Sequence, residues 1–186
     1  MERRKFFKNS CACGMISLVS ASQFFGIAGT PQEETKKNIP LRMNAEQVKK
    51  MLKYVDSTQS RTVKKNIFGQ LGYECFYSNN LDKWIEPYIG NVQAFLDNIN
   101  IAKKSKYWEK LEFDAEHTQL ILTGRVVTGC ACAFAEIDNP PLSLCHYCCK
   151  SFQEQIFSKL LGKKVNVEVT TGFLLGNDRC NTIIHV

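Results

Sequence analysis

The chain has few prolines and no long apolar run. Its 186 residues include 5 prolines and 11 glycines, too few for a collagen-like or low-complexity chain. No stretch of about 18 consecutive apolar residues occurs, which excludes a protein that crosses a membrane several times. Hydrophobic residues make up 44% and charged residues 23% of the sequence, as in an ordinary globular protein.

Motifs of common enzyme classes are missing as well. The sequence has no serine in a glycine-flanked elbow, no His-Glu-x-x-His, no phosphate-binding loop and no dinucleotide-binding glycine pattern. A cysteine hydrolase would need a thiolate beside a base. The available combinations join one of two cysteines to one of three histidines: Cys145 or Cys148 with His117, His146 or His185. The sequence therefore does not decide whether the protein is an enzyme.

The amino terminus is basic and then weakly apolar. Arg3, Arg4, Phe6, Phe7 and Lys8 precede a segment, 11–28, that is rich in small residues and has no acidic ones. This pattern resembles a twin-arginine export signal. An uncleaved basic amphipathic start is the alternative. We expect three parts: a signal peptide over 1–28, a polar linker over 29–43 and a single cysteine-rich domain over 44–186.

Export by this route implies a periplasmic or other extracytoplasmic location, with the twin-arginine machinery as a partner. The resemblance also implies export in the folded state, which suits proteins that first acquire a metal or cofactor. Without residues 1–28 the chain keeps 20 basic and 17 acidic side chains, a net charge of +3. We therefore expect no nucleic-acid partner and no membrane span in the mature chain. A homodimer stays open.

Hydrophobic periodicity predicts an α+β domain. Apolar residues recur at helical spacing from Asn44 to Gly72 and, with a break at Pro87 and Gly90, from Leu81 to Ile99. We expect amino-terminal helices followed by an antiparallel sheet of four or five strands, with one carboxy-terminal helix packed on it. The expected carboxy-terminal helix runs from Cys145 to Gly162; the expected strands are a hairpin over 107–125, an extension over 126–134, and strands over 163–170 and 179–186.

Cysteine is the unusual component of the mature chain. Seven cysteines follow residue 28, and two close pairs, Cys130-Ala-Cys132 and Cys145-His-Tyr-Cys148, are separated by a short loop. Such spacing can place four thiolates around one ion, and soft thiolates select zinc or, as a second choice, an iron–sulfur cluster. The candidate ligands are Cys130, Cys132, Cys145, Cys148 and Cys180, with Cys149, His146 and Glu168 as additional or substitute ligands.

Two other uses of these cysteines stay open. In an oxidising compartment, six of the seven could form three disulfides in any of fifteen pairings. Buried cysteines can also act simply as small apolar residues.

The carboxy-terminal quarter resembles known families. Its segments Cys145-His-Tyr-Cys-Cys, Leu160-Leu-Gly-Lys-Lys-Val-Asn-Val-Glu168 and Leu175-Gly-Asn-Asp-Arg-Cys180 are similar to the end of the vinyl-reductase-type small-molecule-binding domain and of amino-thiazoline-carboxylate hydrolase-like proteins. The first resemblance implies a zinc ion held by cysteines and a glutamate, and Glu168 and Cys180 match by position. Thr171 stands where that pattern has a further cysteine.

Together these features predict an exported zinc-binding domain in which the metal is mostly structural. A small apolar ligand or cofactor could lie between helices and sheet. Core packing is the simpler role for the aromatic residues there, which are Phe68, Phe76, Trp84, Tyr88, Phe95 and Trp108. The alternatives are a hydrolase of a small carbon–nitrogen substrate and a disulfide-stapled interaction module.

Overall fold

A computed structural model describes residues 44–101, 105 and 107–186. The predicted signal peptide and linker lie outside these residues. Within the described part, polar caps at Asn44, Ser60 and Asn91 define the starts of three helices, since their side chains accept hydrogen bonds from otherwise unpaired backbone N–H groups. The helices are α2 (Ala45–Thr58), α3 (Arg61–Ser78), α4 (Leu81–Ile85), α5 (Val92–Asn100) and α6 (Lys150–Leu161).

Four antiparallel strands form one sheet. They are β1 (Trp108–Phe113), β2 (Gln119–Gly124), β3 (Asn166–Thr171) and β4 (Asn181–His185), in the spatial order β1-β2-β4-β3. The predicted α+β class, with a four-stranded sheet and a carboxy-terminal helix packed on it, is confirmed.

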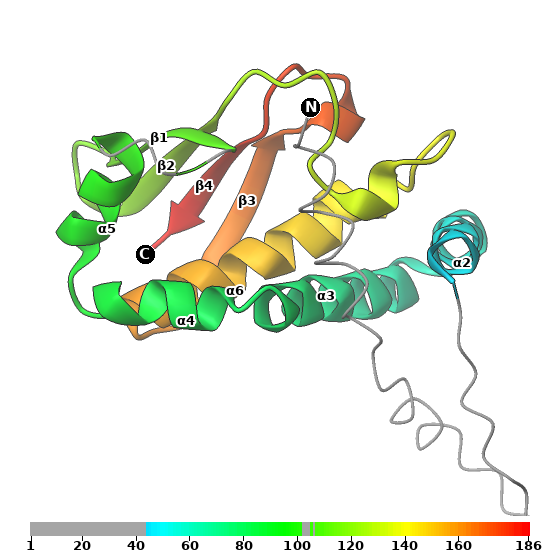
Figure 1. Ribbon diagram of the computed structural model, residues 1–186, viewed down its shortest axis with the longest axis horizontal. Coiled ribbons are helices and arrows are strands. Elements are labelled where there is room, and N and C mark those ends of the chain that lie inside the picture. Colours follow the sequence, from blue (N-terminus) through cyan, green and yellow to red (C-terminus); the bar gives the residue numbers. More distant parts are fainter. Residues whose placement is uncertain (1–43, 102–104, 106) are drawn as a thin grey trace, which may run out of the picture.

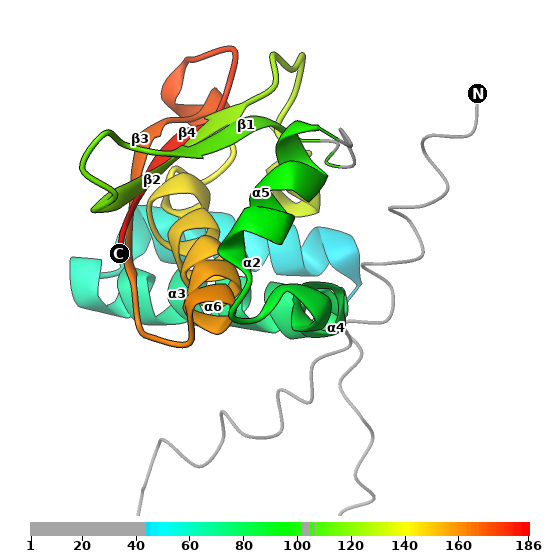
Figure 2. The ribbon, with the colours of Figure 1, turned by 90° about the vertical axis from the view of Figure 1, so that its left-hand side faces the viewer.

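Helix α6 lies between the sheet and the amino-terminal helices. Figure 1 shows α6 under the sheet, with α3 and α4 on the side of α6 that faces away from the strands. Figure 2 shows the same order of layers from the side, with α5 against β1. Both faces of α6 are therefore covered over much of its length, which explains why Ile156, Phe157 and Leu160 are fully buried.

Aromatic side chains fill the space between the sheet, α5 and α6. Trp108 stacks on Phe157 with ring centroids 5.9 Å apart, and Phe95 lies edge-on to Trp84 at 5.4 Å. Such offset and edge-on contacts add to the stabilisation from apolar burial. The predicted core role of the aromatic residues is confirmed: Phe76, Trp84, Tyr88, Phe95 and Trp108 belong to the main apolar cluster, and Phe68 is buried in a second one.

Two sequence-based boundaries were wrong. Residues 126–134 do not extend the sheet; instead, they belong to an irregular loop over 125–143 that contains only a short 3-10 turn, Ala133–Ala135. The carboxy-terminal helix does not begin as an α-helix either. Its first turn, Leu144–Cys149, is π-helical and is called η4 below. A π-turn has no signature in a 3.6-residue apolar pattern, because it inserts one residue without changing which residues are apolar.

The β1–β2 hairpin is closed by an aspartate turn. Asp114 Oδ1 accepts hydrogen bonds from the backbone N–H groups of Thr118 (2.8 Å) and Gln119 (3.0 Å). Its second carboxylate oxygen accepts the Thr118 hydroxyl at 2.9 Å. The bond from the Gln119 backbone, followed by those from Thr118, holds the pKa of the Asp114 carboxyl below its usual value of 3.8.

This turn gives the domain a pH-dependent contribution to stability. Because the folded pKa of Asp114 is lowered, its contribution is present above pH 3.8 and is lost as the pH falls through the folded pKa. Asp114→Asn should therefore unfold at lower urea concentration than wild type at neutral pH, and the two curves should converge in strong acid. The control is Glu116→Gln in the same turn. An equal gap between Asp114→Asn and wild type at both pH values would contradict the assignment.

Among the described residues, no helix combines the length and the apolar character needed to cross a membrane.

Candidate functional site

All seven cysteines of the described chain gather in one region. They come from four segments that are distant in sequence: helix α3 with Cys75, the 125–143 loop with Cys130 and Cys132, η4 with Cys145, Cys148 and Cys149, and the β3–β4 connection with Cys180. Each thiol lies near enough to others in the set to shift their ionisation or to be shifted by them. All seven are free thiols in this structure.

Six of the seven cysteines fall into two groups joined by Cys132, and the seventh, Cys149, is influenced by Cys132 and by all three members of the first group. The first group, which we call the thiol trio, consists of Cys130, Cys145 and Cys180. Cys180 raises the pKa of both Cys130 and Cys145, and Cys130 also raises the pKa of Cys145. In the second, which we call the thiol pair, the side chains of Cys75 and Cys148 are hydrogen-bonded to each other. Cys132 is influenced by a member of each group, Cys130 and Cys75.

Glycines allow the backbone to approach three of these cysteines. On five of the eight described glycines an added methyl group would meet no atom within 4 Å. On the other three, the nearest atom would belong to a cysteine of the cluster: the backbone carbonyl of Cys148 for Gly72, the backbone carbonyl of Cys180 for Gly124, and the Sγ atom of Cys145, at 3.2 Å, for Gly172. Close packing around the cysteines therefore requires glycine at three positions, and a positive φ favours glycine at three others, Gly90, Gly162 and Gly176.

The π-turn η4 presents its three cysteines from a fixed position. It starts at Leu144, two residues beyond Pro140-Pro141, and the backbone N–H of Leu144 donates to the Pro141 carbonyl at 3.1 Å. The Ser143 hydroxyl does not cap the turn, because it donates to the Asp56 carboxylate of α2 instead. That bond connects η4 to the amino-terminal helices. π-Turns within helices are frequent at functional sites.

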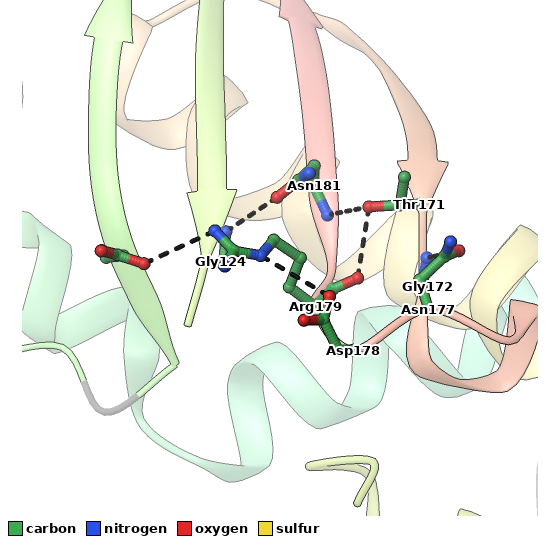
Figure 3. A network of polar contacts seen from close by, with 8 residues as sticks. Gly124, Thr171, Gly172, Asn177, Asp178, Arg179 and Asn181 are labelled. Atoms are coloured by element: carbon green, nitrogen blue, oxygen red, sulfur yellow. Dashed lines mark hydrogen bonds and ion pairs between the residues drawn. The ribbon is translucent and has the colours of Figure 1, made fainter. Parts of the chain in front are cut away.

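A polar network holds the chain on both sides of Cys180 (Figure 3). The Thr171 hydroxyl donates to the Arg179 carbonyl at 3.2 Å and accepts the backbone N–H of Asn181 at 3.0 Å. The Asn181 side chain in turn accepts the N–H of Gly124 at 3.1 Å. The residue that replaces the further cysteine of the resembled pattern thus fixes the backbone around Cys180.

Burial keeps most of these thiols protonated. It raises the pKa of Cys145 to about 11 and that of Cys132 to about 12, with smaller contributions from neighbouring cysteines. The pKa of Cys149 is also raised, and burial is again the largest cause. Cys75 alone has a lowered pKa, because the Cys148 thiol donates a hydrogen bond to it. A nucleophilic cysteine needs a lowered pKa, so the predicted hydrolase nucleophiles Cys145 and Cys148 lack the required environment.

The other predicted site residues lie elsewhere. Glu168 is exposed on β3 and pairs with His185 Nε2 at 3.7 Å. His117 sits in the hairpin turn against the Phe113 ring. His146 is exposed beside Tyr147 and lines a surface hollow of about 290 Å³ with Asp56, Arg61, Lys64, Leu142 and Ser143. The structure thus gives each histidine surroundings other than a hydrolase site.

The predicted metal ligands are gathered but do not form a finished site. Within residues 44–101, 105 and 107–186, no three His, Cys, Asp or Glu side chains are grouped closely enough to hold a metal ion. The thiols have the right donor chemistry for a soft metal. The 125–143 loop is anchored at Val127, whose N–H donates to the Asp178 carbonyl at 2.8 Å, and again at Glu136, whose carbonyl accepts the Lys49 ammonium of α2 at 3.1 Å. Cys130 lies between these two anchors.

Sequence analysis missed Cys75 as a member of the cluster. It lies 55 residues before Cys130 and inside a helix, where it has the appearance of one more apolar position. Three residues before it, Gly72 was taken as the end of the helix, but α3 continues to Ser78. The available signal was the spacing of Gly72 and Cys75. Residues three apart lie on the same helix face, so a small residue there indicates that the cysteine faces a closely packed neighbour.

Comparison with known proteins leaves the earlier resemblances as predictions. The chain matches no model of a known protein family, and it has no significant match among curated proteins.

Proposed function

We propose that this protein binds one soft metal ion, with zinc as the first candidate, through the thiol trio Cys130, Cys145 and Cys180 and with Cys132 as the fourth ligand. The observation that carries the proposal is the convergence of the trio. Its three thiols come from a loop, a π-turn and a hairpin, and they influence one another's ionisation: Cys180 acts on Cys130 and Cys145, and Cys130 acts on Cys145. Bringing protonated thiols together adds little to the stability of the fold by itself, because a buried cysteine behaves as a small apolar residue.

Metal binding in this site is coupled to closing the loop. The thiols must lose their protons and the Cys130 segment must approach η4, so binding releases protons and orders the loop. Four thiolates complete a tetrahedral zinc sphere and leave no position for substrate. The expected role is therefore structural: the ion joins three chain segments that are distant in sequence.

The same proposal accounts for the predicted route of export. A protein that takes up its metal in the cytoplasm must leave the cytoplasm folded, and the twin-arginine pattern at Arg3 and Arg4 resembles the signal for such a route. The expected location is periplasmic or extracytoplasmic. Replacing both arginines with lysine (Arg3→Lys with Arg4→Lys) should keep the protein in the cytoplasm, which cell fractionation would measure.

The small apolar ligand of the sequence-based hypothesis has no support from the described cavities. Two surface hollows, of about 290 and 360 Å³, are lined mostly by charged and polar side chains. The aromatic residues that could have lined a ligand pocket pack on one another instead.

Replacing Cys130 and Cys132 with serine should abolish metal binding and lower the free energy of unfolding by several kcal/mol, because binding and folding are coupled at a structural site. The measurement is metal content by mass spectrometry on natively exported protein, with about one zinc per chain expected in wild type, followed by urea unfolding. The controls are Glu168→Gln, on an exposed strand position, and Cys75→Ser, outside the trio; both should keep the metal. Wild-type protein without metal, or a double variant that retains it, would overturn the proposal.

A further inference from the structure

The thiol pair of Cys75 and Cys148 has a different arrangement from the trio. Its two side chains are hydrogen-bonded directly to each other. They come from two helical segments, α3 and η4, that lie against each other along their length. Cys148 is 5% exposed and Cys75 is half-buried, so one sulfur can be reached from solvent while the other is shielded.

The approach of the two segments is as close as backbones allow. At Gly72, one turn before Cys75, an added methyl group would collide with the Cys148 carbonyl and would lie 2.9 Å from the Phe152 nitrogen. Residues three apart share a helix face, so Gly72 and Cys75 face the same stretch of η4. Thiols in hydrogen-bond contact on closely packed backbones need only a small movement to reach disulfide geometry.

We propose that Cys75 and Cys148 form an intramolecular disulfide that links α3 covalently to η4. The oxidant is a second disulfide, of the low-molecular-weight class represented by oxidised glutathione. The Cys75 thiolate attacks that disulfide and releases one small thiolate; Cys148, after losing its proton, then attacks the Cys75 sulfur and releases the second. One protein S–S bond forms and one small-molecule S–S bond breaks, so two protein thiols are oxidised and the small disulfide is reduced to two thiols.

The order of the two steps follows from the geometry. Cys75 is the more exposed member of the pair, so a small oxidant reaches it first. Cys148 is shielded from the small oxidant but lies against the mixed disulfide that forms at Cys75. The bond uses neither a member of the trio nor Cys132, so it is compatible with the proposed metal site and independent of it.

The test is a disulfide map of the full chain equilibrated in glutathione redox buffers. Free thiols are blocked with an alkylating agent in denaturant and a metal chelator, so that thiols bound to a metal also react, and the protein is digested with chymotrypsin under non-reducing conditions. Cleavage after Tyr73 and Phe76 isolates Cys75, and cleavage after Tyr147 and Phe152 separates Cys148 and Cys149 from Cys145. We expect one linked peptide pair containing Cys75 and Cys148, and a fall from seven to five blockable thiols in the described chain.

Cys149→Ser is the matched control, because Cys149 lies in the same peptide as Cys148; the link should persist in this variant. Cys148→Ser and Cys75→Ser should each lose it, with circular dichroism confirming that both variants fold. A different dominant pair, or seven blockable thiols in a fully oxidising buffer, would overturn the inference. Metal content measured on the same samples separates the two proposals, since wild-type protein that lacks the link but retains the metal contradicts only the disulfide.

Discussion

Gly72→Ala should strongly destabilise the domain. The added methyl group would collide with the backbone of Cys148 and Phe152, and backbone atoms of two packed helices cannot move aside as a flexible side chain can. Overpacking in a well-packed interior costs about 1–3 kcal/mol and sometimes more. We expect the upper end of that range, about 3 kcal/mol, because the clash involves backbone on both sides. Urea unfolding followed by circular dichroism measures the loss.

The matched control is Gly69→Ala on the same helix. A methyl group there would meet no atom within 4 Å, and alanine is the better helix former by about 1 kcal/mol. This variant should therefore be as stable as wild type or more stable. Equal effects of the two substitutions would contradict the close approach of α3 and η4. Gly72→Ala should also reduce the yield of the Cys75–Cys148 disulfide, since it separates the two sulfurs.

Local signals in the sequence predicted much of the fold. Asn44 caps α2 in a reciprocal capping box with Gln47, and Gly162, in the left-handed conformation at φ 66°, ends α6. The polar turn at Asp114 closes the expected hairpin. Each of these depends on residues within a few positions of one another, and for that reason a single sequence can reveal them.

The 125–143 loop was predicted wrongly because its conformation depends on distant partners. Val126 and Val127 have the composition of a strand, but β2 already has β1 and β4 on its two sides. At Gly124 the chain passes against the Cys180 backbone, which leaves no free edge to extend. From there the backbone bonds to Asp178 instead of to a strand. An alternating apolar pattern predicts that a segment can form a strand, but it does not show whether the sheet has a free edge with which that strand could pair.

The candidate site was predictable in its members but not in its grouping. The spacing of Cys130, Cys132, Cys145 and Cys148 suggested two pairs that face one ion. In the structure Cys148 turns to Cys75, and Cys180 takes its place beside Cys130 and Cys145. This exchange arises from the π-turn, which changes the directions of Cys145 and Cys148 relative to an α-helix, and from the packing of α3, which no motif in the sequence encodes.

Phe157→Ala should cost about 3–5 kcal/mol, the usual penalty for removing a large buried aromatic side chain. Phe157 is fully buried and lies against Phe95 and Trp108. The two tryptophans of the chain, Trp84 and Trp108, belong to the same aromatic group, so their fluorescence reports directly on this region. Emission should shift in the folded variant, and urea unfolding should give the loss of stability. Tyr54→Ala, at a side chain 63% exposed, should change stability by less than about 0.5 kcal/mol.

This substitution also tests whether the domain holds an apolar ligand. If the aromatic side chains fill the space between helices and sheet in wild type, a small apolar probe such as benzene or xenon should bind the cavity left in Phe157→Ala and should not bind wild type, as dry apolar cavities take up such probes. Binding of the probe to wild type, weakened by the substitution, would instead indicate a natural pocket in this place. The function would then include an apolar ligand beside the metal, and the aromatic group would be its binding surface.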